Sequence, residues 1–141
     1  MKKRFELVSR SEVLAPLRKE LRELLAQAGW EKKIAEEILL AVDEALTNII
    51  RHAYGGQAGT MTVIFSDGPE QTEITLEDRG KAFDPNQVPP PELPRSEPGG
   101  LGVHFIRAVM DRVVYDASFK DGNRLRLIKL KSKDPKGEGE T

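Results

Sequence analysis

The sequence has no cysteine, only two histidines and no long apolar run. Without cysteine there are no disulfides, thiolate metal ligands or cysteine nucleophiles, and two histidines leave little for a zinc site. No segment approaches the roughly 20 apolar residues that a membrane helix needs, and the charged N-terminus leads into no signal-peptide-like stretch. Neither sign of charge dominates, since 22 Lys+Arg stand against 23 Asp+Glu, so no overall basic field favours nucleic acid. We expect a cytoplasmic protein that binds neither membranes nor nucleic acid.

The chain of 141 residues has the length of a single domain. Apolar residues alternate with a period of two in five segments, which predicts strands over residues 3–9, 59–65, 70–77, 112–119 and 123–130. A period of three to four residues predicts helices over residues 9–29, 30–54 and about 103–110. Ser9 or Ser11 is expected to cap the first helix.

This order of elements contains two hairpins and no repeated strand–helix–strand units. It indicates an α+β fold, a two-layer α/β sandwich with a mostly antiparallel sheet. The Pro- and Gly-rich residues 85–102 are too irregular for a helix or strand and form a long loop. We expect residues 1–131 to form the domain and the polar residues 132–141 to be a flexible tail.

Three polar side chains lie four residues apart on the second predicted helix. Glu44, Asn48 and His52 therefore share one face, beside the apolar stripe. The row is either the solvated edge of an amphipathic helix or a functional site. In a functional site the carboxylate is a general base, the amide oxygen a hard-metal ligand and the imidazole an orienting group. The spacing alone leaves both interpretations open.

Two further motifs are also ambiguous when taken singly. The segment Asp78–Pro85 follows a strand and is either ordinary turn chemistry or a binding site. In a binding site Asp78 is a buried acceptor for an exocyclic amine, and Gly80 lets a flat ring approach the backbone. The segment Gly99–Gly102 opens a helix and is either a flexible linker or an anion cradle of backbone N–H groups. It is neither a Walker A loop nor a dinucleotide fingerprint.

In this order the three motifs resemble the GHKL superfamily of ATP-binding domains, which is found in DNA gyrase, heat-shock chaperones, histidine kinases and MutL. The matching segments are Asp43–Asn48 with His52–Tyr54, Asp78–Gly80 with Phe83–Pro85, and Gly99–Gly102 with Ile106–Asp111. Within the superfamily the chain most resembles the bacterial anti-sigma-factor serine/threonine kinases. The resemblance covers almost the whole chain and implies a Bergerat-type ATP-binding fold.

The resemblance implies ATP and Mg²⁺ as cofactors and gives each matching residue a role. Glu44 would be the catalytic residue that positions or deprotonates the attacking group, and Asn48 would ligate Mg²⁺. Asp78 would accept a hydrogen bond from the adenine amino group, and residues 85–102 would form a lid over the phosphates. The other cofactor-binding residues would be His52, Gly80, Phe83, Gly99, Gly100, Leu101 and Gly102.

The chain departs from the superfamily pattern in two places. The motif that begins at Asp78 lacks the second glycine that many members have. Arg126 stands about where many members place a small hydroxyl residue near adenine, so the resemblance assigns no residue to that part of the adenine pocket.

The resemblance also implies an activity: an anti-sigma factor with Mg²⁺-ATP-dependent protein serine/threonine kinase activity. Such a protein would phosphorylate an anti-sigma-factor antagonist of STAS type and sequester an alternative sigma factor. Exposed apolar faces of the first helix and first strand would support a homodimer. Two alternatives stay open, a nucleotide-binding partner-switch module without phosphotransfer and an interaction protein without nucleotide.

Overall fold

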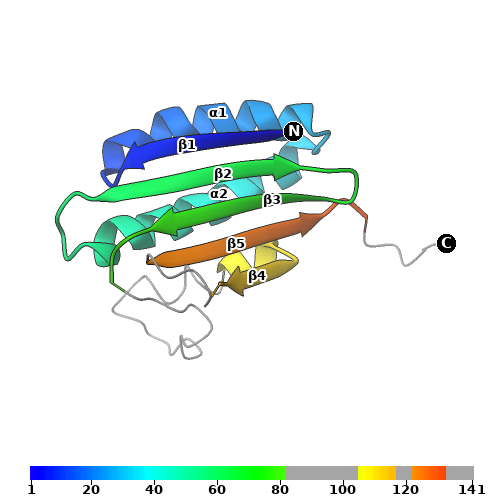
Figure 1. Ribbon diagram of the computed structural model, residues 1–141. Coiled ribbons are helices and arrows are strands. Elements are labelled where there is room, and N and C mark those ends of the chain that lie inside the picture. Colours follow the sequence, from blue (N-terminus) through cyan, green and yellow to red (C-terminus); the bar gives the residue numbers. More distant parts are fainter. Residues whose placement is uncertain (82–104, 117–121, 133–141) are drawn as a thin grey trace, which may run out of the picture.

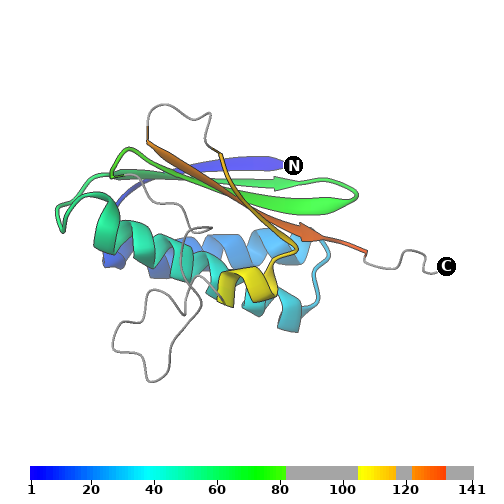
Figure 2. The same ribbon diagram turned by 90° about the horizontal axis from the view of Figure 1, so that it is seen from below.

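The computed structural model describes residues 1–81, 105–116 and 122–132. Within these ranges five strands form one antiparallel sheet in the order β1-β2-β3-β5-β4, and helices α1 and α2 cover one of its faces (Figures 1 and 2). The strands are β1 (Lys2–Val8), β2 (Thr60–Asp67), β3 (Gln71–Asp78), β4 (Arg112–Tyr115) and β5 (Asn123–Leu130). The helices are α1 (Leu14–Gln27) and α2 (Lys32–Asn48), and residues 105–109 are also helical. The predicted α+β two-layer sandwich is confirmed.

Several predictions fall on residues that the structure does not describe. They concern the lid over residues 85–102, the residues Phe83, Gly99, Gly100, Leu101 and Gly102, and most of the tail. These stay predictions. In the described part of the chain, no helix combines the length and apolar character needed to cross a lipid bilayer.

The core lies between the sheet and the two helices. The alternation in the predicted hairpin places its apolar side chains on the helix-facing side of the sheet, where Val63, Phe65, Ile74 and Leu76 are buried. Gly68 closes the hairpin turn, its N–H donating to the carbonyl of Gln71 at 3.0 Å. The period-two pattern therefore predicted both the strands and the face that each buries.

The first helix begins differently from the prediction. A 3-10 turn, η1 (Ser11–Val13), precedes α1, and no side chain caps either element. Ser9 instead joins β1 to the start of β2, because its N–H donates to the carbonyl of Gly59 at 2.9 Å and its Oγ accepts from the Gly59 N–H at 2.7 Å. The serine-cap prediction is wrong, since a strand-to-strand contact uses the hydroxyl of Ser9.

Gly29 ends α1 with a φ of 94°. Its N–H donates to the carbonyl of Ala26 at 3.0 Å, and the N–H of Trp30 donates to that of Leu25 at 3.1 Å. This pair of hydrogen bonds is a Schellman motif, in which a left-handed residue after the helix satisfies its last carbonyls. The predicted stop at Gly29 is confirmed.

The apolar face of α1 is not exposed. Its buried leucines pack into the core: Leu17, Leu21, Leu24 and Leu25. Among the described residues the exposed large hydrophobic side chains are Met1, Val8 and Leu40. The expected exposed apolar face on the first helix is therefore wrong, because the sheet and α2 cover that face. The homodimer itself stays a prediction.

The second predicted helix changes its geometry near its end. Helix α2 stops at Asn48, and a π-helical segment, η2 (Ile49–Ala53), continues the chain to Tyr54. A π-helix forms hydrogen bonds five residues apart instead of four, so its side chains leave the α-helical rows. The span 30–54 was predicted well, but a continuous α-helix over it is wrong.

Residues on either side of α2 contact β3 and the turn that follows it. At the start, Trp30 Nε1 donates to Thr72 Oγ1 at 2.8 Å. At the other end, the N–H of Lys81 donates to the carbonyl of Ala53 at 2.6 Å. The 17 residues of α2 span about 26 Å at 1.5 Å per residue, and the eight residues of β3 span about 27 Å. Helix α2 and β3 thus have similar lengths, and Asn48 and Asp78 at their ends line the same recess.

Gly80 makes this contact possible. A Cβ at Gly80 would overlap the carbonyl oxygen and carbonyl carbon of Ala53. No rotation of a side chain could relieve this overlap, because the atoms that it meets belong to the backbone.

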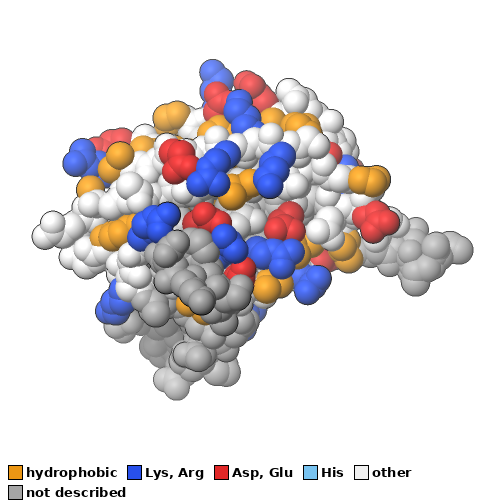
Figure 3. Space-filling model, viewed as in Figure 1, with side chains coloured by type: hydrophobic (Ala, Val, Ile, Leu, Met, Phe, Trp, Pro, Cys, Tyr) orange, Lys and Arg blue, Asp and Glu red, His pale blue; other side chains and the backbone are white. Residues whose placement is uncertain are grey.

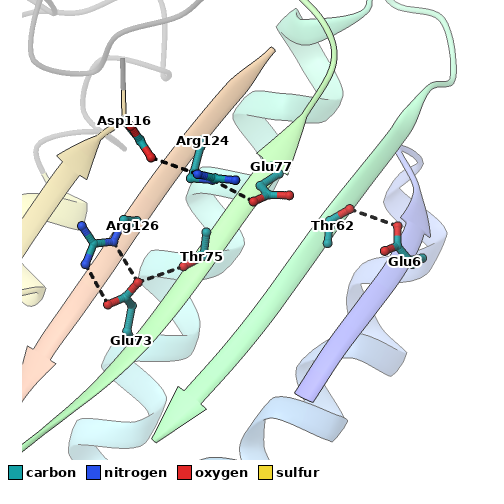
Figure 4. Close-up of polar contacts among 8 residues, drawn as sticks. All are labelled: Glu6, Thr62, Glu73, Thr75, Glu77, Asp116, Arg124 and Arg126. Atoms are coloured by element: carbon teal, nitrogen blue, oxygen red, sulfur yellow. Dashed lines mark hydrogen bonds and ion pairs between the residues drawn. The ribbon is translucent and has the colours of Figure 1, made fainter. Parts of the chain in front are cut away.

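The outer face of the sheet, away from the helices, is polar. Figure 3 shows Lys, Arg, Asp and Glu side chains interspersed over it. Glu73 binds Arg126 through two hydrogen bonds of 2.9 and 3.1 Å, and Arg124 lies between Glu77 and Asp116 (Figure 4). The pKa of the Glu73 carboxyl lies below its ordinary value, because Arg126 donates hydrogen bonds to the carboxylate and outweighs the opposing effect of burial.

We expect Glu73→Gln to lower the free energy of unfolding at pH 7 by roughly 1 kcal/mol or less, as for partly exposed ion pairs. A carboxyl whose pKa is lower in the folded state stabilises the protein above its unfolded pKa and loses this effect as the pH falls through the folded value. The difference between wild type and variant should therefore shrink as the pH falls below about 4.5. Urea unfolding between pH 7 and pH 3 measures it. Glu23→Gln, at an exposed position on α1, is the control, and a pH-independent difference would contradict the assignment.

We expect Gly80→Ala to destabilise the fold by at least about 1–3 kcal/mol, because the added methyl group forces β3 and η2 apart. Gly68→Ala is the matched control, since the nearest atom to its added Cβ is the Gln71 carbonyl oxygen at 3.9 Å. That variant should change stability by less than about 1 kcal/mol. Equal effects in urea unfolding would show that the contact with Ala53 does not matter.

Candidate nucleotide-binding site

A recess opens where α2, η2 and the neighbouring ends of β3, β4 and β5 meet. Its lining residues are Ala45, Asn48, Ile49, His52, Ala53, Leu76, Asp78, Lys81, Ile106, Tyr115, Asn123 and Leu125. Strand geometry places three of the polar ones: Asp78 is the last residue of β3, Tyr115 the last of β4 and Asn123 the first of β5. Apolar walls with a few convergent polar groups are typical of small-molecule sites.

Asp78 has one carboxylate oxygen satisfied and one available. Its side chain is buried, with the residue 5% exposed. Oδ1 accepts hydrogen bonds from the Gly80 N–H and from Asn123 Nδ2, both at 2.9 Å. No described residue donates to Oδ2. Asp78, a lining residue of the recess, thus keeps one acceptor without a partner among the described residues.

Asn48 is the second buried polar side chain without a full set of partners. It is 9% exposed, and none of the described residues forms a hydrogen bond with its side-chain amide. Buried side-chain polar groups nearly always have a partner. The recess therefore holds an amide and a carboxylate oxygen whose bonding capacity is unused, on elements 30 residues apart in sequence.

Of the three side chains predicted to share one face of the second helix, two line the recess and one does not. Asn48 and His52 line it, whereas Glu44 is half-buried and is not a lining residue. His52 is exposed and belongs to the π-helical segment, so it does not continue the α-helical row. The structure brings Asn48, His52 and Asp78 together and leaves Glu44 one helical turn away from Asn48.

Gly80 has a packing reason to be glycine. The sequence prediction was that it admits a flat ring, but the atoms closest to it belong to Ala53. Its N–H is also used, because it donates to Asp78 Oδ1. Gly80 thus shapes the recess through the backbone, and a direct contact with a ligand stays a prediction.

Arg126 does not lie near the recess. It lies on the outer face of the sheet and binds Glu73, while its neighbour Leu125 lines the recess. Successive residues of a strand point to opposite faces, so Arg126 cannot share the face of Leu125. The position that the resemblance gave Arg126 is therefore not at the recess.

The sequence reasoning missed Asn123 and Tyr115. Asn123 is 7% exposed and its Nδ2 donates to Asp78 Oδ1 and to the Lys81 carbonyl. Tyr115 donates to Asn123 Oδ1 at 3.2 Å. The period-two pattern of β5 could have predicted that Asn123 is buried, because residues 123, 125 and 127 share the helix-facing side of the sheet.

The recess offers one side-chain ligand of a type that suits a hard cation such as Mg²⁺, and not a complete set. The amide oxygen of Asn48 is a ligand type that Mg²⁺ accepts. Within residues 1–81, 105–116 and 122–132 no group of three or more His, Asp and Glu side chains could hold a metal ion.

Comparison with known proteins assigns the chain to a family. Residues 7–129 match the model of the histidine kinase-like ATPase domain. The chain is also similar to serine-protein kinases RsbW from two strains of Bacillus cereus, at 29% identity over 129 residues. The RsbW protein of Bacillus thuringiensis subsp. konkukian is 28% identical over the same length. These alignments cover 80% of this chain and 79% of each relative. The family model spans most of the chain and the fold agrees with the motif order, so this chain belongs to the histidine kinase-like ATPase domain family.

Proposed function

We propose that this chain is a Mg²⁺-ATP-dependent protein serine/threonine kinase that acts as an anti-sigma factor. It would phosphorylate an anti-sigma-factor antagonist of STAS type and sequester an alternative sigma factor. The observation that carries the proposal is the pair of buried, incompletely bonded polar groups, Asn48 and Asp78, at one recess. The similarity to serine-protein kinases supports the reaction class.

The recess would hold the purine of ATP. Asp78 Oδ2 would accept a hydrogen bond from the amino group of adenine, and the side chains of Ile49, Leu76 and Leu125 would contact the ring. Burying one flat apolar ring against these side chains removes water from the hydrogen bond and strengthens it.

Asn48 would supply one oxygen ligand to Mg²⁺, and nucleotide phosphates and water would complete the coordination. The bound ion would neutralise the negative charge of the phosphates during phosphoryl transfer. Glu44 would orient the accepting serine or threonine hydroxyl of the partner and take its proton. His52 and Lys81 would line the route from the recess to the phosphates.

Calorimetric titration with ATP and Mg²⁺ tests the nucleotide site. We expect Asn48→Ala to bind at least about tenfold more weakly, since the loss of a bond to a charged group costs about that much affinity. EDTA should weaken binding to wild type and have little further effect on the variant. Thr47→Ala is the control, because Thr47 is the preceding residue of α2 and does not line the recess. Metal-independent binding in wild type would count against Asn48 as a ligand.

Transfer of the γ-phosphate to candidate antagonists tests Glu44. We expect Glu44→Gln to bind ATP as wild type does and to transfer phosphate at least about 100-fold more slowly, as for loss of a general base. Glu37→Gln, on the same helix two turns earlier, should retain transfer. If wild type binds ATP but transfers phosphate to no antagonist, the partner-switch module without phosphotransfer is the correct function.

A further inference from the structure

A row of three side chains on α2 leads from the surface of the helix to the recess. Leu40, Glu44 and Asn48 lie four positions apart on α2, so each is about 6 Å further along the same side of the helix. Asn48 lines the recess and Glu44 does not. Leu40, at the other end of the row, is 52% exposed. The row therefore starts at an exposed apolar side chain and ends at the proposed nucleotide site.

Packing within the chain does not explain a leucine at position 40. Between residues 34 and 48 of α2, all of which the structure describes, Leu40 is the only exposed residue. A surface helix normally places polar side chains on its solvent side. Leu40 belongs neither to the core nor to the partly buried residues packed against it. Of the large hydrophobic side chains that are exposed in the described part of the chain, it is the one that lies on a helix.

Four carboxylates surround Leu40 on the helix surface. The neighbours of a helical residue are those three and four positions before and after it. For Leu40 these are Glu36, Glu37, Asp43 and Glu44. An apolar centre within a charged rim is the arrangement found at protein–protein interfaces. We call these five residues the Leu40 patch.

The rim of the Leu40 patch has a neutralised side and a charged side. Arginines of α1 donate to Glu36 at 2.7 Å and to Asp43 at 2.9 Å. Glu37 and Glu44 are half-buried, and no described residue forms a hydrogen bond or ion pair with either carboxylate. The patch therefore presents uncompensated negative charge beside Leu40, which attracts a positively charged surface.

The position of Glu44 indicates which partner would cover the patch. A group that takes a proton must come within hydrogen-bond reach of the hydroxyl that loses it, so the acceptor protein must cover the surface around Glu44. On α2 the residues one turn from Glu44 are Leu40 and Asn48, and Asn48 lines the recess. Leu40 thus lies on the side from which an acceptor can approach while a nucleotide occupies the recess.

We infer that the Leu40 patch is the docking surface for the protein that accepts the phosphate. The acceptor places an apolar side chain on Leu40 and a lysine or arginine beside Glu37, and its serine or threonine hydroxyl then reaches Glu44. This inference rests on the proposed kinase function and names the surface that recognises its protein substrate.

Leu40→Ala tests the apolar contact. The probe is a purified STAS-type antagonist that wild type phosphorylates, and initial rates at varied antagonist concentration separate KM from kcat. We expect KM for the antagonist to rise at least about fivefold, as for loss of a central interface side chain. The kcat and the Kd for ATP should not change. Because Leu and Ala are both strong helix formers, the variant should unfold in urea as wild type does.

Val8→Ala is the matched control for Leu40→Ala. Val8 is also an exposed apolar side chain, with 46% of its surface accessible, but it lies at the end of β1. Its KM for the antagonist should stay within about twofold of the wild-type value, as for surface substitutions outside an interface.

Glu37→Lys tests the charge of the partner. It should raise KM for the antagonist at least about fivefold and leave kcat unchanged, because a basic surface then meets a like charge. Added salt should raise the KM of wild type, since it screens the attraction, and should raise that of Glu37→Lys less. Glu70→Lys makes the same charge change at an exposed position in the turn between β2 and β3 and should behave as wild type does.

An unchanged KM in Leu40→Ala or Glu37→Lys would overturn the inference, and so would a fall in kcat without a rise in KM. Sedimentation velocity adds a further check. If wild type is a dimer and Leu40→Ala a monomer, a second copy of the chain covers the patch and the inference is wrong. A wild-type chain that binds ATP and phosphorylates no antagonist would instead refute the proposed kinase function and the inference with it, so the two failures are distinguishable.

Discussion

The recess depends on the close approach of two backbones, that of Ala53 at the end of η2 and that of Gly80 and Lys81 after β3. The hydrogen bond between them and the absence of a side chain at Gly80 let the end of the helical layer lie against the end of a central strand. At the other end, Trp30, two residues before α2, donates to Thr72 of β3. These two contacts hold the helical segment along β3, and Asn48 and Asp78 line the same recess.

Polar side chains on the outer face of the sheet are bonded to one another, whereas some of those at the recess are not. On the outer face, carboxylates and guanidinium groups satisfy one another within the chain, as Glu73 and Arg126 do. In the recess, Asn48 and one oxygen of Asp78 have no such partner among the described residues. Because desolvated polar groups without partners destabilise a fold, the difference points to the helix-facing side as the place where a ligand belongs.

Apolar periodicity predicted the strands, the helices and the sandwich, because burial follows directly from the repeat of each element. The family resemblance, not the periodicity, grouped Asn48 with Asp78, and the structure places both at one recess. The periodicity did not predict the π-helical segment, which ends at the residue whose carbonyl accepts from the Lys81 N–H, or the use of Ser9 between strands. Asn123 was missed because its importance comes from Asp78, 45 residues earlier in the chain. Arg126 was misplaced because its position was inferred from family resemblance and not from strand alternation.

The turn after β3 has three successive amides, and each has a bonded acceptor. The N–H of Arg79 donates to the hydroxyl of Tyr54 at 2.8 Å, that of Gly80 to Asp78 Oδ1 at 2.9 Å, and that of Lys81 to the Ala53 carbonyl at 2.6 Å. Tyr54 also donates to the carbonyl of Thr60, which ties the turn to β2. A loop held in this way has already lost its conformational entropy on folding, so a ligand that binds against it loses little further entropy in ordering it.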